Sequence, residues 1–307
     1  MKTITEPFIR YELLEEGRIA RITLDREKSR NAQNRGMLVE LNESFMKAES
    51  DDNVRVVILC GAGPIFSAGH DLGSKEALAE RNPDGPDFHP SYAKNGGTRK
   101  AAERRMLQEW HYFFENTRRW RNLRKITIAQ VQGTVYAAGL MLMWACDLIV
   151  AAEGTTFDDV VGTRLGMCGV EYFAHPWEFG PRRTKELMLT GDSIGVDEAY
   201  SLGMVSKVFP SGELAEKTLA FAQRIADLPT MTALLIKESV NQTVDNMGFY
   251  NGLQACFTLH QLNHSHWAEL HDDKFHAARP EDGVVDWRNA PPIVPSIKDQ
   301  VRADEPG

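Results

Sequence analysis

Apolar and polar residues alternate along the chain in two different rhythms. Short runs rich in β-branched and apolar residues are typical of strands, and some of them read as strands buried on both faces. These runs are residues 8–13, 19–24, 54–59, 126–131 and 148–151. Between them, residues 37–48 and 100–123 place apolar side chains three or four apart, which predicts amphipathic helices. An alternation of this kind predicts an α/β fold whose parallel strands are joined by right-handed crossovers.

Later parts of the chain have a different pattern. Residues 214–226, 231–247 and 252–271 have helical periodicity. Residues 73–99 are rich in Gly, Pro, Asn and Asp, which predicts a long surface insertion. We therefore expect a core over residues 1–210, a helical region over 211–278 and an extended tail over 279–307, where proline and charge replace any core pattern.

Composition narrows the function classes. The 307 residues carry a formal net charge of −8, whereas a nucleic-acid-binding protein normally has a basic face. The four cysteines are widely spaced, which indicates free thiols in a reducing compartment. The longest apolar stretch, residues 135–152, is interrupted by Gly139 and Asp147 and is too short to span a bilayer. With no signal-peptide pattern at the start, we expect a cytoplasmic protein with neither nucleic-acid nor membrane partners.

Five short motifs occur in a particular order. They are SRNA at residues 29–32, FSAGHDL at 66–72, IAQVQG at 128–133, LTGD at 189–192 and KESVN at 237–241. In this order and spacing they resemble the crotonase (enoyl-CoA hydratase/isomerase) superfamily, over about residues 8–250. The resemblance implies a crotonase-like ββα spiral fold with a C-terminal helical region. It also implies an acyl-coenzyme A substrate, no separate cofactor, and a homotrimer or homohexamer.

The resemblance assigns two backbone N–H groups to an oxyanion hole. One belongs to His70, after the Ala68-Gly69 pair, and the other to Ala138, in the turn before a helix. Preorganised donors of this kind stabilise the negative charge that develops on a thioester oxygen, and the loss of one donor costs about 3–4 kcal/mol in studied hydrolases. For the His70 side chain two interpretations remain. Its imidazole either points elsewhere or takes part in acid–base chemistry.

A second implied element binds coenzyme A. The resemblance sets Ala68, Asp71 and Leu72 against the adenine, and basic side chains of the early turn against the phosphates. The candidate cations are Arg26, Lys28 and Arg30. The alternative for each cation is an ordinary solvated position.

The sequence departs from the hydratases of this family at both catalytic glutamates. The matching positions are Met141 and Val161, or Gly162 if one gap is allowed, and none of them transfers protons. Nearby acids are Asp158-Asp159 and Glu171, any of which could act as the acid or base, although a helix cap or turn also explains the aspartates. The resemblance therefore implies an acyl-CoA enzyme of the enoyl-CoA hydratase/isomerase family that stabilises a thioester enolate. The alternatives are a C–C hydrolase, lyase or isomerase acting on a cyclic or bulky acyl-CoA, and a non-catalytic CoA-binding homologue.

The run HQLNHSH at residues 260–266 is distinctive. His260 and His264 are four apart and share one helix face, whereas His266 lies elsewhere on the helix. A zinc pair, a base and polar packing between subunits are all compatible with this spacing. The Asp158-Asp159 pair could also suggest a metal, but no histidine or third acid is close to it in the sequence, so we expect no metal.

Overall fold

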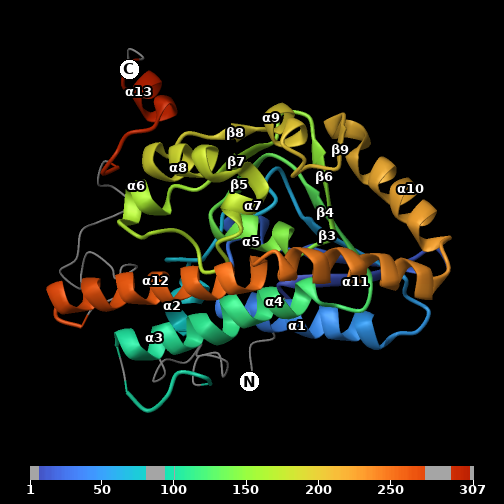
Figure 1. Cartoon of the computed structure of the whole chain (residues 1–307), viewed down its shortest axis with the longest axis horizontal. Coiled ribbons are helices and arrows are strands. Elements are labelled where there is room, and N and C mark those ends of the chain that lie inside the picture. The colour runs from blue at the N-terminus through green and yellow to red at the C-terminus, as the bar shows by residue number, and fades with distance from the viewer. Residues whose placement is uncertain (1–6, 81–93, 100, 274–291, 305–307) are drawn as a thin grey trace.

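The computed structural model describes residues 7–80, 94–99, 101–273 and 292–304. Its centre is a six-stranded sheet with strand order β1-β2-β3-β4-β6-β9 (Figure 1). The strands are β1 (Ile9–Leu14), β2 (Ile19–Leu24), β3 (Val56–Gly61), β4 (Ile126–Val131), β6 (Leu148–Ala152) and β9 (Lys207–Phe209). Only the β1–β2 hairpin is antiparallel, and each later strand pairs in parallel with its neighbour. The predicted α/β class is confirmed.

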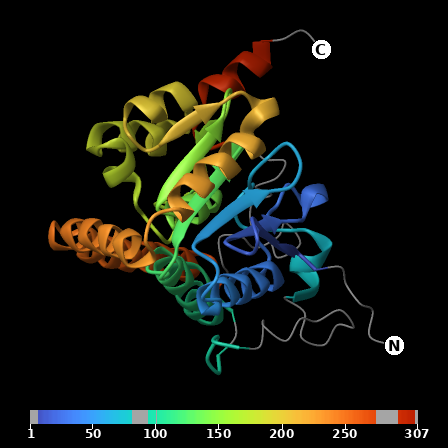
Figure 2. The same cartoon turned by 90° about the vertical axis from the view of Figure 1, so that its right-hand side faces the viewer.

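Both faces of this sheet are covered, which explains why its strands are almost continuously apolar. On one face, Val56 and Ile58 of β3 pack with apolar residues of α10 (Leu214–Ala226). On the other face, Val57 and Leu59 join the main core. Figure 2 shows α10 in front of the parallel strands, and α1 (Arg35–Ser50) contributes Met37, Leu38, Leu41, Phe45 and Ala48 to the main core.

A smaller three-stranded sheet adjoins the first. It has the order β5 (Thr134–Tyr136), β7 (Thr156–Asp158) and β8 (Ile194–Gly195). Short helices follow its strands, namely α5 (Ala138–Trp144), α6 (Val161–Leu165), α7 (His175–Phe179), α8 (Pro181–Thr190) and α9 (Val196–Ser201). The parallel pair β5–β7 brings residues 136 and 158 side by side and so positions the turn at the start of α5.

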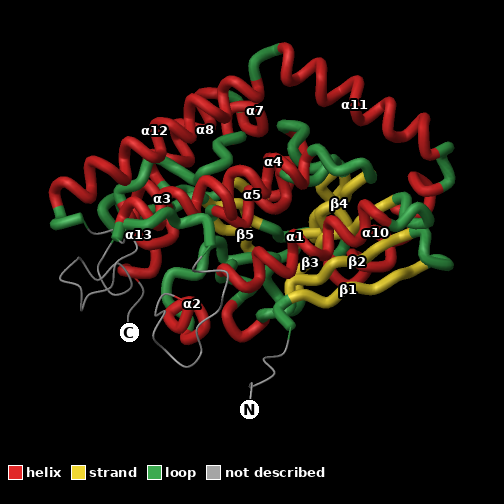
Figure 3. The backbone as a smooth tube through the Cα atoms, turned by 90° about the horizontal axis from the view of Figure 1, so that it is seen from below, coloured by secondary structure: helices red, strands yellow, loops and turns green. Residues whose placement is uncertain are grey.

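Two long helical segments lie beside this core. The first consists of α3 (Ala102–Glu109), a π-helical stretch (Trp110–Glu115) and α4 (Asn116–Arg121). The second consists of α11 (Thr230–Asn246) and α12 (Phe249–Leu270), which follow one another along one edge of the molecule (Figure 3). α12 packs on α3, so residues distant in the sequence meet there.

Two predicted irregular segments contain helices. In the insertion, Lys75–Glu80 form α2, while residues 81–93 lie outside the described residues. The tail was expected to be extended, but Ile297–Asp304 form α13, so that prediction is wrong there. Ser296 and Asp299 bond to each other at the start of α13, and Asp299 pairs with Arg164 at 2.9 Å. A local cap and ion pairs from Asp299 and Lys298 thus order a segment that lacks a core pattern.

Among the described residues no single helix is long and apolar enough to cross a membrane. The pair Ser211–Ala226 and Thr230–Asn246 passes that test only jointly, and it is bent by 103°.

Candidate active site

A cavity of about 400 Å³ lies between the two sheets' loops and the helices α3, α6 and α12. Its wall brings together segments that are far apart in the sequence. It is lined by Ala32, Ala68, His70, Asp71, Leu72, Gly73, Glu109, Tyr136, Ala137, Val160, Val161, Arg164, Leu165, Met167, Gly169, Val170, Glu171, His260 and His264. The mostly apolar wall with a few converging polar groups is typical of a small-molecule site.

The loop after β3 presents the His70 N–H to one side. The Gln33 N–H donates to the Gly69 carbonyl at 2.8 Å, and the Asp71 N–H donates to the Gln33 carbonyl at 3.0 Å. In this parallel bridge between Gln33 and His70, the N–H of His70 itself faces away from Gln33. Gly69 has a φ of +83°, which favours glycine. The loop therefore directs the N–H of His70 to the side opposite Gln33.

The turn before α5 approaches this loop closely. A Cβ at Gly69 would lie 3.2 Å from the Ala138 nitrogen and 2.9 Å from the Tyr136 oxygen. Ala137 has a φ of +45°, unusual for a residue with a Cβ, and its N–H donates to the Asp158 carbonyl at 2.8 Å. Ala138 then begins α5, where the first amides have no partner within the helix. Ala137 lines the cavity, whereas Ala138 is fully buried behind it.

The imidazole of His70 is paired with a buried acid. Its Nε2 lies 2.9 and 3.1 Å from the two carboxylate oxygens of Glu171, and its ring stacks on Phe113. Burial alone would raise the pKa of Glu171, but the charge and hydrogen bond of His70 outweigh it and lower that pKa. Both side chains line the cavity. The interpretation in which the imidazole points away from the site is therefore wrong.

A second polar cluster lies on the same wall. The Nε2 atoms of His260 and His264 are 3.1 Å apart, and Oε2 of Glu109 lies 3.5 and 3.1 Å from them. All three side chains are buried. Burial opposes a charged Glu109, yet the two histidines lower its pKa. Burial likewise opposes protonation of His260, but Cys168, Glu109 and Glu171 raise the pKa of His260 well above its ordinary value.

Glu109 was missed by the sequence reasoning, although a signal was present. It lies three residues after Met106 and four before Phe113, on the stripe expected to be buried. A carboxylate within an apolar helical stripe needs a partner, because an unpaired buried charge is costly. His264 and His260 are those partners. His266, two residues further along α12, is exposed.

The structure places Asp158 and Asp159 beside the site but not on its wall. The Asp158 carboxylate accepts from Ser193 and lies 3.4 Å from the Lys298 ammonium. Asp159 is fully buried, with its carboxylate 2.9 Å from His175 and accepting from the Val161 amide at the start of α6. Neither side chain lines the cavity. The helix-cap and turn alternative does not describe them either, because Asp158 ends β7, α6 has no side-chain cap at its N-cap residue, and both aspartates are buried in internal contacts.

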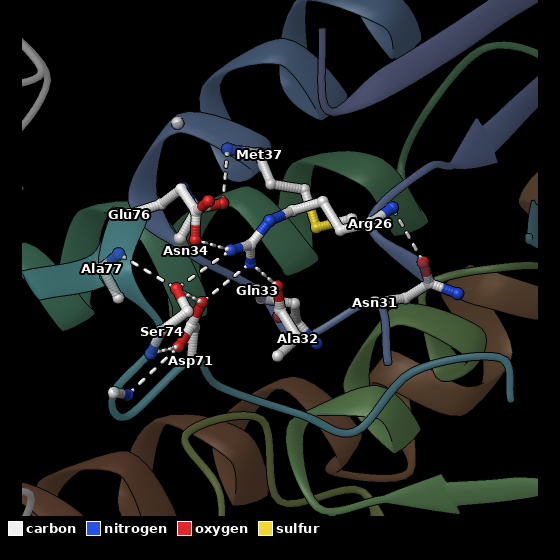
Figure 4. Close-up of polar contacts among 12 residues, drawn as sticks. Arg26, Asn31, Ala32, Gln33, Asn34, Met37, Asp71, Ser74, Glu76 and Ala77 are labelled. Atoms are coloured by element: carbon white, nitrogen blue, oxygen red, sulfur yellow. Dashed lines mark hydrogen bonds and ion pairs between the residues drawn. The ribbon is translucent and has the colours of Figure 1, made fainter. Parts of the chain in front are cut away.

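The candidate coenzyme A residues separate into two groups. Ala68, Asp71 and Leu72 line the cavity. Arg26, by contrast, is buried and binds Asp71 at 2.8 Å, with further contacts to Ser74 and Glu76 (Figure 4). Its guanidinium therefore already has partners and is not directed at a ligand phosphate.

The other residues assigned to coenzyme A are either exposed to solvent or hold the loop in place. Lys28 and Arg30 are exposed, and the Arg30 carbonyl accepts from the Ala68 N–H at 2.9 Å. Burial opposes ionisation of Asp71, but Ser74 and Arg26 donate to its carboxylate and lower its pKa. The ion pair thus holds the loop that carries Leu72 at the cavity.

The two positions of the hydratase glutamates are both apolar here. Met141 is buried in the main core. Val161 lines the cavity, and Gly162 packs behind it, with room for a Cβ limited by the Met188 carbonyl at 3.0 Å. The carboxylates on the cavity wall are instead Glu109, Glu171 and Asp71.

Comparisons with known proteins agree with this geometry. The sequence model of the enoyl-CoA hydratase/isomerase family matches residues 15–271. The putative enoyl-CoA hydratase EchA13 of Mycobacterium tuberculosis is 68% identical over 95% of this chain and 91% of its own length. A probable enoyl-CoA hydratase from Mycobacterium smegmatis superposes with a TM-score of 0.75 at 36% identity, over 86% of this chain and 97% of that one. One from Mycobacterium thermoresistibile gives 0.75 at 38%, over 86% and 98%.

Proposed function

Because the chain belongs to the enoyl-CoA hydratase/isomerase family, we propose that it is an acyl-CoA enzyme that stabilises a thioester enolate. The backbone N–H groups of His70 and Ala138 hold the thioester oxygen. Support comes from the close approach of the two turns, with Gly69 packed against the Ala138 nitrogen. Donors fixed in this way lower the barrier without reorganising as charge develops.

The proton is moved by Glu171, with His70 orienting its carboxylate. The observation that carries this assignment is the buried Glu171 carboxylate bonded to His70 at 2.9 Å, next to the oxyanion loop. His70 lowers the pKa of Glu171, so the carboxylate is ionised at neutral pH, as a base must be. In an isomerisation, Glu171 therefore removes a proton from the α-carbon to give the enolate. In a C–C cleavage the enolate forms when the C–C bond breaks, and the protonated Glu171 returns a proton to the α-carbon.

Coenzyme A enters past the loop that carries Ala68, Asp71 and Leu72. Lys28 and Arg30 are exposed on the early turn and are available to the phosphates, whereas Arg26 acts by holding Asp71. The cavity of about 400 Å³ lies in the size range of small-molecule sites. Coenzyme A arrives as part of the substrate, and no separate cofactor is needed for enolate formation.

Exchange of the α-proton tests this proposal. Saturated and β-oxo acyl-CoA thioesters are incubated with the full chain in D₂O, and deuterium incorporation is followed by mass spectrometry. The Glu171→Gln variant keeps the size and loses the base, so exchange falls by about 10²–10⁴-fold. Thioester binding, measured by calorimetry, changes far less.

Asp158→Asn is the matched control, because Asp158 is also a buried acid but does not line the cavity. It leaves exchange within a few-fold of wild type. Binding of these thioesters without exchange by the wild-type chain would contradict the proposal and favour a non-catalytic CoA-binding homologue.

Hydration is a second candidate, favoured by one observation. Glu109 and Glu171 line the same cavity, so two carboxylates face one ligand site although neither occupies a hydratase glutamate position. Hydration of an enoyl-CoA that is lost equally in Glu109→Gln and Glu171→Gln would support this candidate. A wild-type chain without hydration activity would exclude it, and hydration lost in neither variant would exclude Glu109 and Glu171 as its acid and base.

Assembly into a homotrimer or homohexamer is proposed from the surface of α11. Apolar side chains on this helix are more than half exposed, namely Met231, Leu235, Ile236 and Val240. Several exposed apolar residues on one helix are typical of a surface that a second copy covers.

A further inference from the structure

Three donor atoms of the second polar cluster form a nearly regular triangle. The Nε2–Nε2 distance between His260 and His264 is 3.1 Å, and Oε2 of Glu109 is 3.1 Å from His264 and 3.5 Å from His260. Ligand atoms about 2.1 Å from a tetrahedral zinc ion are about 3.4 Å apart, so one ion fits against all three atoms. The three side chains are buried and line the cavity.

The two Nε2 atoms have hydrogen-bond geometry toward each other, whereas the contacts of Oε2 of Glu109 do not. Oε2 of Glu109 is buried, yet it makes no hydrogen bond of good geometry to any of the described residues. It nevertheless lies within ion-pair distance of two imidazoles. A shared cation explains why two nitrogens and a carboxylate oxygen converge on one point.

The placement of the two histidines is also typical of metal ligands. His260 and His264 are four apart on α12, so both imidazoles project from one helix face. Nδ1 of His260 lies 2.9 Å from the Gly169 carbonyl. That bond keeps a proton on Nδ1, so a metal that binds Nε2 displaces only the second proton of the imidazolium, and the ring then has the usual arrangement of a ligating histidine.

The third ligand lies at an irregularity in its helix. Glu109 is the last residue of α3, directly before the π-helical turn Trp110–Glu115. Such π-helical turns are frequent at functional sites, and they shift the register of the side chains that follow. Here the shift occurs where Glu109 meets α12.

We propose that Glu109, His260 and His264 bind one divalent transition-metal ion, with zinc as the best match to two imidazoles and one carboxylate. This differs from the expectation of no metal drawn from the sequence. Three protein ligands leave a fourth position open, and it faces the cavity. The ligand class for that position is an oxygen donor on the acyl group, such as a β-oxo or carboxylate oxygen, or water.

Glu171 lies between this site and His70. One of its carboxylate oxygens lies 3.9 Å from Nε2 of His260, while the other is 2.9 Å from His70. An acyl group held by the oxyanion turns thus has Glu171 on one side and the metal's open position beyond it. An oxygen-bearing acyl group is therefore bound better than a plain alkyl chain.

Metal binding is measured directly on the full chain. The purified protein is stripped with a chelator, and Zn²⁺ is titrated in a competition assay with a chromophoric chelator. We expect one Zn²⁺ per chain, and Co²⁺ bound in its place shows the intense visible absorption of a tetrahedral site. His264→Ala and Glu109→Gln each weaken Zn²⁺ binding by more than about 100-fold, because each removes a direct ligand.

His266→Ala is the matched control, since it removes an exposed histidine from the same helix. It leaves Zn²⁺ affinity unchanged. Circular dichroism shows whether His264→Ala folds, and Glu109→Gln keeps the test decisive if it does not. A wild-type chain that binds Zn²⁺ no better than Glu109→Gln, or a His266→Ala variant that loses as much, overturns the proposal.

The readout separates this site from the proposed function. Zn²⁺ titration needs no acyl-CoA, and α-proton exchange by Glu171 is measured without added metal. If the wild-type chain binds no zinc and His264→Ala still loses α-proton exchange, the cluster is a proton relay. That result would overturn the metal site.

Discussion

Arg26 stands where the sequence suggests a phosphate contact, yet its charge is already neutralised. Its side chain is 5% exposed, and that of Asp71 is 4% exposed. Removing one partner of a buried pair leaves an uncompensated charge, which costs far more than losing a pair at the surface. At the scale of single residues, the ion pair is therefore a structural element of the cavity loop.

Asp71→Asn should lower the free energy of unfolding by about 3–5 kcal/mol at neutral pH, measured by urea denaturation. The pKa of Asp71 is lowered below 3.8 in the folded chain, so its contribution is complete above that pH and is lost as the pH falls through the folded value. The difference between the variant and wild type should therefore shrink at acidic pH.

Asp25→Asn is the control for this prediction. Asp25 pairs with Arg10 at 2.6 Å, but the two side chains are 34% and 51% exposed. Asp25→Asn should lower the free energy of unfolding by no more than about 1 kcal/mol at any pH. Equal losses of unfolding free energy in the two variants would show that burial of the Arg26–Asp71 pair adds nothing to stability.

At the scale of elements, the site depends on two turns that touch. The loop after β3 and the turn before α5 meet where Gly69 has no Cβ. The hydrogen bond from Ala137 to the Asp158 carbonyl joins the second turn to β7. Backbone conformations that are unfavourable for ordinary residues persist at such places because the surroundings hold them.

Gly69→Ala should reduce α-proton exchange by about 10²–10³-fold while the chain still folds. The added Cβ would press on the Tyr136 oxygen at 2.9 Å and the Ala138 nitrogen at 3.2 Å, which separates the two proposed donors. Exchange in D₂O is the measurement, and thermal unfolding reports the cost in stability.

Gly203→Ala controls for backbone strain alone. Gly203 has a φ of +88°, close to the +83° of Gly69, but a Cβ there meets nothing within 4 Å. Both variants should lose about 1–2 kcal/mol of stability from the positive φ. If Gly203→Ala also loses exchange, or Gly69→Ala keeps it, the contact between the turns is not what holds the site.

At the scale of the whole molecule, α11 presents an uncovered apolar face. It packs on α12 and β4 through one face, while Leu235 and Val240 are each 57% exposed on another. An uncovered apolar surface of this kind favours association between copies, since burial contributes about 25 cal/mol per Å².

If the proposed homotrimer or homohexamer forms through this face, the double variant Leu235→Asp, Val240→Asp should be a monomer where the wild type is an oligomer, as measured by light scattering after size-exclusion chromatography. Leu13→Asp, which changes a 48% exposed leucine on β1, should keep the native mass. A double variant with the wild-type mass would place the interface elsewhere.

Much of this protein follows from the sequence by itself. Strand and helix periodicity predicted the sheet and its order of elements, because burial on one or both faces leaves a local pattern. The motif around His70 and the match to one family predicted the loop and the turn that meet at Gly69. The absence of acids at Met141 and Val161 is likewise visible without a structure.

Only the tertiary structure decided which polar groups meet. It brought Glu171 to His70 and Glu109 to His260 and His264, and it committed Arg26 to Asp71. In the sequence, Asp158 and Asp159 lie near the position of the family's second glutamate. Their side chains nevertheless contact Ser193 and His175. Periodicity reports burial along one element, whereas a buried charge is stabilised by a partner from another element, and that pairing has no local signature.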